Sequence, residues 1–256
     1  MAAMGPARQQ PTAERKNGSP PRFLASGDAA LIVEFGSTVD RRTNAKVLTL
    51  FDRLTAAKIP GVIEAIPTFR SLLVQYDPLT IRHRELRARL EGMVKGLVGK
   101  KHAGRRWHIP LCYGGAHGPD LEDVAKRTGM TPKQVIETHS AVDYNVYMIG
   151  FLPGYPYMGD LPQMLELPRR ENPRLKVAPG SVCIAMRMTA IYPIESPGGW
   201  NLLGRTPARL WDMRADPPAL LATGDMVRFE PISAEEFERL DRRALAGTWR
   251  MEAVAA

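Results

Sequence analysis

A chain of 256 residues is long enough to bury one large hydrophobic core or two smaller ones, and two is the better expectation. It contains no run of about 18 apolar residues, and residues 1–22 lack the apolar centre of a secretory signal, so neither a membrane partner nor secretion is expected. The cysteines are Cys112 and Cys183, a number that fits a reducing cytoplasm better than a disulfide scaffold.

The formal net charge of +8 does not by itself indicate a nucleic-acid partner, because residues 1–22 carry four basic residues and one acidic residue. A second basic stretch, Arg82 to Arg106, mixes Arg and Lys with helix-forming residues and has no aromatic side chain on which bases could stack. Its simplest interpretation is a solvated helix face. We therefore expect no nucleic acid, although a basic surface can still steer an anionic ligand.

The first half of the chain predicts a compact α+β unit over residues 22–100, after a polar, proline-rich tail at residues 1–21 that we expect to be disordered. Apolar residues recur at helical spacing in two segments, and shorter apolar runs between them indicate strands. The predicted elements are a strand over residues 29–36, a helix over 40–59, strands over 62–69 and 71–76, and a helix over 79–97.

This order of elements is typical of a split βαβ sandwich of the ferredoxin-like type, provided that one more strand follows the second helix. Residues 107–113 or the basic linker around Gly99–Gly104 are the candidates for that strand. The two helices would then cover one face of an antiparallel sheet.

The second half predicts a closed β-barrel, because many short strands alternate with Gly and Pro turns. Thr131, Pro132 and Gln134 form a favourable helix start, and Ser233 with Glu236 forms a capping box for a terminal helix. The predicted elements are a strand over residues 106–113, helices over 120–128 and 131–140, a strand over 144–151, short strands to residue 232 and a helix over 233–245.

The stretch from Gly150 to Pro207 is the most informative part of the sequence. It is dense in Pro and Gly, which exclude a helix, yet it keeps aromatic and aliphatic residues, which exclude a disordered linker. Rigid loops between strands are the usual place for binding and catalytic groups. We therefore expect the functional site here.

Single residues in and near this stretch admit two interpretations. His139, at a helix C-terminus, is either a favourable charge there or a general acid/base, and Arg169-Arg170 are either solvated or a clamp for a carboxylate or phosphate. Gly199 to Thr206 is only an imperfect match to a phosphate-binding loop. His108, Cys112 and His117 do not make a convincing zinc site, so no metal ligand is assigned.

The stretch contains several short motifs in a fixed order: Gly150-Phe-Leu-Pro-Gly-Tyr-Pro-Tyr157, Pro168-Arg-Arg170, Ala178-Pro-Gly-Ser-Val182, Ile191-Tyr-Pro193, Ser196-Pro-Gly-Gly-Trp200 and Gly204-Arg-Thr-Pro207. Together they resemble the family of the first subunit of bacterial ATP-dependent 5-oxoprolinase, also called allophanate hydrolase subunit 1, whose sequence is a subdomain of the carboxyltransferase domain. The resemblance covers roughly residues 22–240.

The resemblance implies a ferredoxin-like N-terminal domain over residues 22–100 and a cyclophilin-like β-barrel, the carboxyltransferase-type domain, over residues 105–240. It implies hydrolysis of 5-oxo-L-proline to L-glutamate with ATP as co-substrate, no bound organic cofactor, and a larger homologous subunit as partner. On this basis the candidate residues are His139, Glu195 and Arg205 for catalysis and Arg169, Arg170, Tyr192, Gly198 and Gly199 for substrate binding.

Two alternatives stay open: a carboxyltransferase component of the urea carboxylase type, and a non-catalytic histidine-kinase inhibitor like the family's sporulation member. One departure favours the inhibitor. Met188 stands where the family usually has a Gln, and a thioether cannot replace the donors and acceptor of an amide.

Aromatic and Met residues among rigid loops are typical of an interface core, so we also expect the segment 151–158 to bind the partner subunit. The interface residues predicted in this way are Phe151, Leu152, Tyr155, Tyr157 and Met158.

Overall fold

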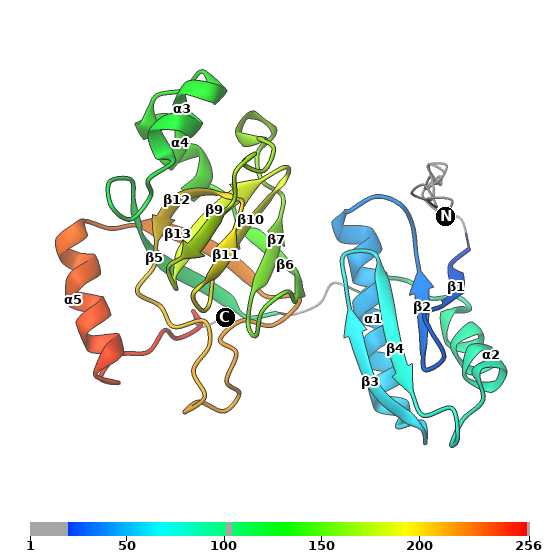
Figure 1. Ribbon diagram of the computed structural model, residues 1–256. Coiled ribbons are helices and arrows are strands. Elements are labelled where there is room, and N and C mark those ends of the chain that lie inside the picture. Colours follow the sequence, from blue (N-terminus) through cyan, green and yellow to red (C-terminus); the bar gives the residue numbers. More distant parts are fainter. Residues whose placement is uncertain (1–19, 101–103, 255–256) are drawn as a thin grey trace, which may run out of the picture. The chain divides into compact units, whose positions relative to one another are not determined.

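The computed structural model describes residues 20–100 and 104–254, which form two compact units (Figure 1). The first unit ends at Gly99; the second begins at Lys100 and also includes residues 67–69. Residues 1–19 of the expected tail and 101–103 of the expected linker lie outside the described range. Within the described residues, no helix has the length and apolar character needed to cross a membrane.

The first unit contains a four-stranded sheet with the order β1-β2-β4-β3 and two helices. Asp40 begins the first helix by accepting a hydrogen bond from the backbone N–H of Thr43 at 2.9 Å. The elements are β1 (Arg22–Ala25), β2 (Ala30–Glu34), α1 (Arg41–Ala57), β3 (Val62–Pro67), β4 (Ser71–Tyr76) and α2 (His83–Val94). Alternate residues of the central strands, such as Leu31 and Val33, share one buried core with Leu50 and Leu86 of the helices.

The expected ferredoxin-like arrangement of this unit is not confirmed. Residues 107–113, the candidate for its last strand, belong instead to β5 in the second unit, where they pair with β12 and β13. The sheet edge beside β2 is occupied by β1, which precedes the first helix and pairs antiparallel with β2. The sequence does not predict a strand at residues 22–25, because so short a segment next to a proline-rich tail carries almost no alternation.

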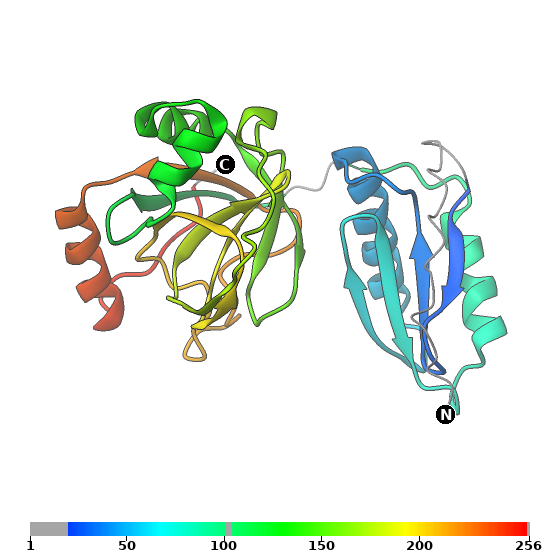
Figure 2. The same ribbon diagram turned by 45° about the horizontal axis from the view of Figure 1, so that its top comes forward.

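The second unit is a closed barrel with the strand order β10-β7-β6-β13-β5-β12-β9 and a separate two-stranded sheet of β8 and β11. Helices α3 and α4 lie together against the barrel, while α5 contacts β5 (Figures 1 and 2). The barrel strands are β5 (Arg106–Tyr113), β6 (Tyr144–Ile149), β7 (Pro156–Gly159), β9 (Ser181–Ala185), β10 (Met188–Ile191), β12 (Asn201–Arg205) and β13 (Met226–Pro231). The other elements are α3 (Leu121–Thr128), α4 (Pro132–Ser140), the 3₁₀ helix η1 (Gln163–Leu165), β8 (Arg174–Val177), β11 (Ser196–Gly198) and α5 (Ala234–Leu245).

Side chains along β9 and β10 alternate between two apolar clusters, as the period of a strand requires. Val182, Ile184 and Ile191 belong to the main core of the barrel. Cys183 and Ala190 belong to a second cluster, with Tyr155, Tyr192 and Trp200, which we call the aromatic cluster. The barrel wall is therefore apolar on both faces, which explains why β9 is buried at every residue.

The chain continues to pack on the barrel beyond residue 240, where the expected second domain ends. Trp249 and Met251 pack against the main core, and Val254 forms a β-bridge with Arg106. This C-terminal segment carries no regular alternation that would predict its return to the barrel.

His139 lies wholly buried near the end of α4, with both ring nitrogens hydrogen-bonded. The hydroxyl of Thr189 donates to the carbonyl of Cys183 at 3.0 Å, so His139 Nε2 must be the donor to Thr189 Oγ1, also at 3.0 Å. His139 Nδ1 is then the acceptor for the Tyr113 hydroxyl at 2.7 Å. The ring stacks on Phe229 with centroids 4.9 Å apart, which completes a dry environment for a neutral imidazole.

Replacing His139 with Gln should flatten the acid side of the stability profile. Burial lowers the pKa of His139 from 6.5 to about 3, so between these values only the unfolded chain binds the proton. His139 should therefore make the free energy of unfolding fall with decreasing pH by about 1.4 kcal/mol per unit below pH 6.5, a contribution to the slope that the variant lacks. Urea denaturation at pH 7, 6, 5 and 4 measures both curves; parallel curves would contradict the assignment.

Candidate functional site

A buried carboxylate, Asp120, organises the loops of the stretch 150–207. It stands at the N-cap of α3 with its side chain 4% exposed. Arg170 Nη1 donates to its Oδ1 at 2.8 Å, and Arg174 donates from Nη2 to Oδ1 at 2.7 Å and from Nη1 to Oδ2 at 2.9 Å. The backbone N–H of Leu202 donates to Oδ2 at 2.7 Å. One carboxylate thus holds three segments together: α3, the loop that precedes β8, and strand β12.

Arg170 is positioned by this carboxylate at the wall of a surface pocket. The pocket has a volume of about 380 Å³ and is lined by Asp123, Arg127, Pro168, Arg169, Arg170, Glu171 and Asn172. The backbone N–H of Arg170 donates to the carbonyl of Gly199 at 2.7 Å. The backbone of Arg170 is thus held in place as well as its side chain. Its Nε is buried and has no hydrogen-bond partner among the described residues, so this wall holds an unused donor.

The other arginines of the pocket differ in how firmly they are held. Arg127 Nη1 lies 3.2 Å from both Asp123 Oδ2 and Asn201 Oδ1. The guanidinium of Arg169 lies 5.8 Å from the ring centroid of Trp200, within the range of a cation–π contact. Three guanidinium groups and two carboxylates therefore line the pocket, an arrangement suited to binding a small anion.

The aromatic cluster adjoins this pocket through Trp200. The rings of Tyr157 and Trp200 have centroids 5.9 Å apart, and Tyr155 contacts Tyr157 at 4.9 Å and Tyr192 at 5.2 Å. Burial raises the pKa of the Cys183 thiol and of the Tyr155 and Tyr192 hydroxyls. These groups are therefore neutral packing residues, and Cys183 is not an activated nucleophile.

The two glycines predicted to approach a ligand have different surroundings. A Cβ on Gly198 would clash with the hydroxyl of Tyr192, so this position is occupied by a protein side chain. A Cβ on Gly199 would meet nothing closer than Pro173 at 3.5 Å. Gly198 therefore needs to be glycine for packing, whereas Gly199 contributes its carbonyl to the placement of Arg170.

Contacts in the structure connect five of the predicted site residues and leave three apart. Arg169, Arg170, Tyr192, Gly198 and Gly199 are linked through Trp200 and β11. The remaining three are His139, Glu195 and Arg205.

The three separate residues have other partners. Glu195 is exposed and forms an ion pair with Lys176 at 3.2 Å. Arg205 Nε donates to the carbonyl of Pro179 at 2.8 Å, and its guanidinium lies 5.5 Å from the ring centroid of Phe237. His139 lies in the interior network and has no exposed surface.

The predicted interface segment is corrected in two places. Met158 is fully buried in the main core, and Tyr155 is 2% exposed within the aromatic cluster. The prediction is wrong for both: prolines and glycines hide the strand period of β7 around Met158, and Tyr155, which precedes β7, packs into the aromatic cluster. Phe151 is different: it is 64% exposed and has a φ of 72°, a left-handed conformation that is unusual for a bulky residue.

Little in the sequence points to Asp120 as the carboxylate that holds the loops together. The local pattern predicts it only as a helix start, a role in which Asp is common. Met188, at the departure from the family pattern, is half-buried against the aromatic cluster, so it fills apolar space rather than lining the arginine pocket. Across residues 20–100 and 104–254, no group of three His, Cys, Asp or Glu side chains is arranged to hold a metal ion.

Replacing Asp120 with Asn should destabilise the protein by about 3 kcal/mol, because two guanidinium groups lose the charge that compensates their burial. Urea denaturation at pH 7 measures the change. Glu166→Gln is the matched control: Glu166 is 45% exposed and lies 3.9 Å from Arg187, so its loss should leave stability nearly unchanged. Equal effects of the two changes would contradict the role of Asp120.

Comparison with known proteins places this chain in a known family. The family model "Carboxyltransferase domain, subdomain C and D" matches residues 21–221. A 5-oxoprolinase subunit of Bacillus subtilis is 37% identical over 222 residues, covering 82% of this chain and 92% of that protein.

Two solved structures extend the comparison. The structure of TTHA0988 is 36% identical with a TM-score of 0.72, covering 80% of this chain; this chain spans 40% of that protein. Urea amidolyase of K. lactis gives a TM-score of 0.80 over 96% of this chain and 17% of that protein, at 21% identity, which shows a shared fold. The chain belongs to the family of the carboxyltransferase domain, subdomains C and D, together with the 5-oxoprolinase subunit of Bacillus subtilis.

Proposed function

We propose that the chain is a subunit of an ATP-dependent 5-oxoprolinase-type amidohydrolase, which converts 5-oxo-L-proline to L-glutamate together with a larger homologous subunit. The arginine-lined pocket beside Trp200 carries this proposal, because the substrate is small and bears one carboxylate. Arg170, held by Asp120, and Arg169 are the groups that would bind that carboxylate. The free, buried cysteines are in keeping with a cytoplasmic reaction.

The composition of the pocket supports an active site that is completed by a partner. Opening a lactam requires proton transfers and stabilisation of the charge that develops on the amide oxygen. The chain supplies cationic groups, but His139 is sealed in the core and Glu195 is paired with Lys176 on the surface. The proton-transferring groups and the contacts to ATP would then come partly from the second subunit.

The two units of the chain also have separate hydrophobic clusters. This separation supports the further proposal that residues 22–100 and 105–240 fold as two domains, the second a cyclophilin-like barrel extended by its C-terminal segment. The match to a carboxyltransferase family model favours a carboxyltransferase component of the urea carboxylase type as the second candidate function. Release of glutamate from 5-oxoproline separates the two functions.

Co-expression with the larger subunit should yield ATP-dependent release of glutamate from 5-oxoproline, measured by a coupled glutamate assay. Arg169→Ala and Arg170→Ala should each lower kcat/KM by about tenfold or more, mainly through KM, because a charged hydrogen bond to substrate is lost. Arg187→Ala, an exposed arginine outside the pocket, is the control. Full activity of this chain alone, or none from the pair, would refute the proposed function.

Replacing Phe151 with Ser should prevent co-purification with the larger subunit while leaving the melting temperature of the isolated chain almost unchanged. The physical reason is that a 64% exposed aromatic ring gains its burial only at an interface. Met213→Ser, at a 75% exposed position, is the matched control and should keep the partner bound. Retention of the partner by the Phe151 variant would rule out this surface as the interface.

A further inference from the structure

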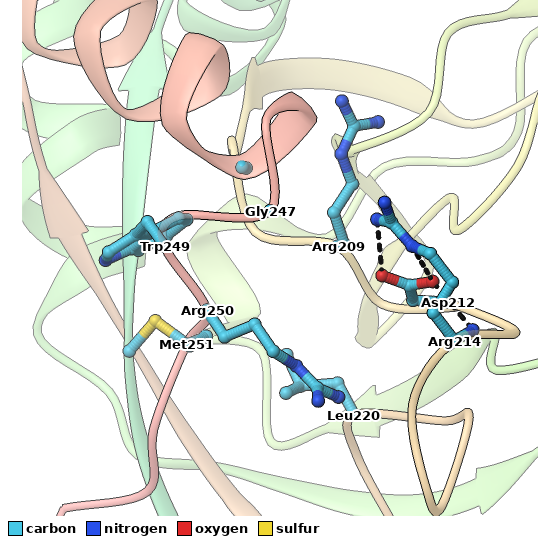
Figure 3. A pocket seen from close by; sticks show the side chains of 9 residues that line it. Arg209, Asp212, Arg214, Leu220, Gly247, Trp249, Arg250 and Met251 are labelled. Carbon is cyan, nitrogen blue, oxygen red and sulfur yellow. Dashed lines mark hydrogen bonds and ion pairs between the residues drawn. The ribbon is translucent and has the colours of Figure 1, made fainter.

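A second pocket lies between α5, the C-terminal segment and the loop after β12. It has a volume of about 250 Å³, and its lining residues are Arg209, Asp212, Arg214, Leu220, Ala244, Gly247, Trp249, Arg250 and Met251 (Figure 3). Three of these side chains are guanidinium groups and one is a carboxylate. None of the residues predicted for the site from sequence lines it.

The carboxylate of this pocket is already committed to one arginine. Asp212 accepts hydrogen bonds from Arg214 Nε at 2.9 Å, from Arg214 Nη2 at 2.7 Å and from the backbone N–H of Arg214 at 3.0 Å. Figure 3 shows this bidentate pair at the side of the pocket. Asp212 therefore has little hydrogen-bonding capacity left for the other two guanidinium groups, and Arg250 acts on it only through its charge.

The other two arginines, Arg209 and Arg250, are held less closely by carboxylates. Arg209 Nη2 lies 3.5 Å from Asp241 Oδ1, a long ion pair with a carboxylate outside the pocket lining. Arg250 forms no ion pair with any residue that the structure describes within 4.0 Å, and it is exposed. The lining carries three positive charges and one negative charge, and the adjacent Asp241 reduces the excess to one positive charge, which favours an anionic ligand.

The neighbouring helix end does not cancel this preference. The pocket borders the C-terminus of α5, where the helix dipole disfavours an anion by a modest amount. The last carbonyl groups of α5 are, however, occupied: those of Arg242, Arg243 and Ala244 accept from the N–H groups of residues 246, 248 and 247. They therefore present few free acceptors toward a bound anion.

The remaining lining is apolar and gives the pocket a firm base. Leu220, Trp249 and Met251 are partly buried and pack against the main core of the barrel. A cavity of about 250 Å³ is smaller than a typical site for a drug-sized ligand, so it fits a phosphate chain better than a whole nucleotide. The planar guanidinium groups are well suited to phosphate oxygens.

We propose that this pocket binds the phosphate groups of a phosphorylated ligand, as free inorganic phosphate or diphosphate or as the phosphate chain of a nucleotide. Its wall from Ala244 to Met251 lies beyond residues 21–221, the region that matches the carboxyltransferase family. The site is thus a feature of this chain's C-terminal segment. It is distinct from the Asp120-centred pocket; binding of free phosphate or diphosphate does not depend on the proposed function, whereas binding of a nucleotide would place its ATP.

Isothermal titration of the full chain with phosphate, pyrophosphate and ATP tests this site without any activity measurement. Arg250→Gln should weaken binding of the tightest of these ligands by about tenfold or more, because one charged contact to phosphate is lost. Arg242→Gln removes an equal charge from the exposed face of α5, outside the pocket, and should bind as the unaltered chain does. Binding should also weaken with added salt.

The three ligands separate the two sources of phosphate. Binding of ATP about tenfold more tightly than pyrophosphate would assign the site to a nucleotide, whereas equal or tighter binding of pyrophosphate or phosphate would assign it to the free anions. Absence of binding by all three up to about 1 mM, or equal losses in the Arg250 and Arg242 variants, would overturn the proposal.

Discussion

The buried Asp120 carboxylate holds the loops of the second unit in place. Four donors from Arg170, Arg174 and Leu202 converge on its two oxygens, and they come from segments far apart in the sequence. An ion group of this kind is costly to bury, and it stabilises the fold only while every partner is present. The same contacts of Asp120 therefore stabilise the loops of the barrel and position Arg170. The pocket depends on the interactions that stabilise the fold.

The barrel wall separates two chemical environments. Its interior holds the main core and the neutral His139, with hydrogen bonds running from Tyr113 through the imidazole and Thr189 to the carbonyl of Cys183. Its other face carries the aromatic cluster, which leads through Trp200 to the arginine pocket. Polar groups in the interior are satisfied and inert, whereas the arginines at the pocket keep exposed surface. This division explains why the residues with the chemistry most familiar from catalysis, His139 and Cys183, are packing residues in this fold.

Several features can be predicted from the sequence because they depend on local regularity. The helices follow from apolar spacing and from capping residues such as Thr131 and Ser233, and both caps are observed. The barrel follows from frequent Gly and Pro turns between short apolar runs. The family follows from motifs, since Arg169-Arg170 and the Gly-Gly-Trp200 sequence occur in a fixed order with the others. The loop-rich segment 151–158 is less tractable: Met158 lies in the core and Phe151 on the surface, and the local pattern does not distinguish them.

The α+β class, the barrel and the family are thus all accessible from the order of the amino acids, whereas the binding role of Arg169 and Arg170 stays a prediction. Three other features emerge only when the chain is folded: which strand completes the sheet of the first unit, the sealing of His139 from solvent, and the role of Asp120 in holding the arginine pocket together. The physical reason is the range of the interactions. Periodicity and capping act within a few residues, whereas the contacts of Asp120 join positions 50 to 82 residues apart, and no local pattern records such a pairing.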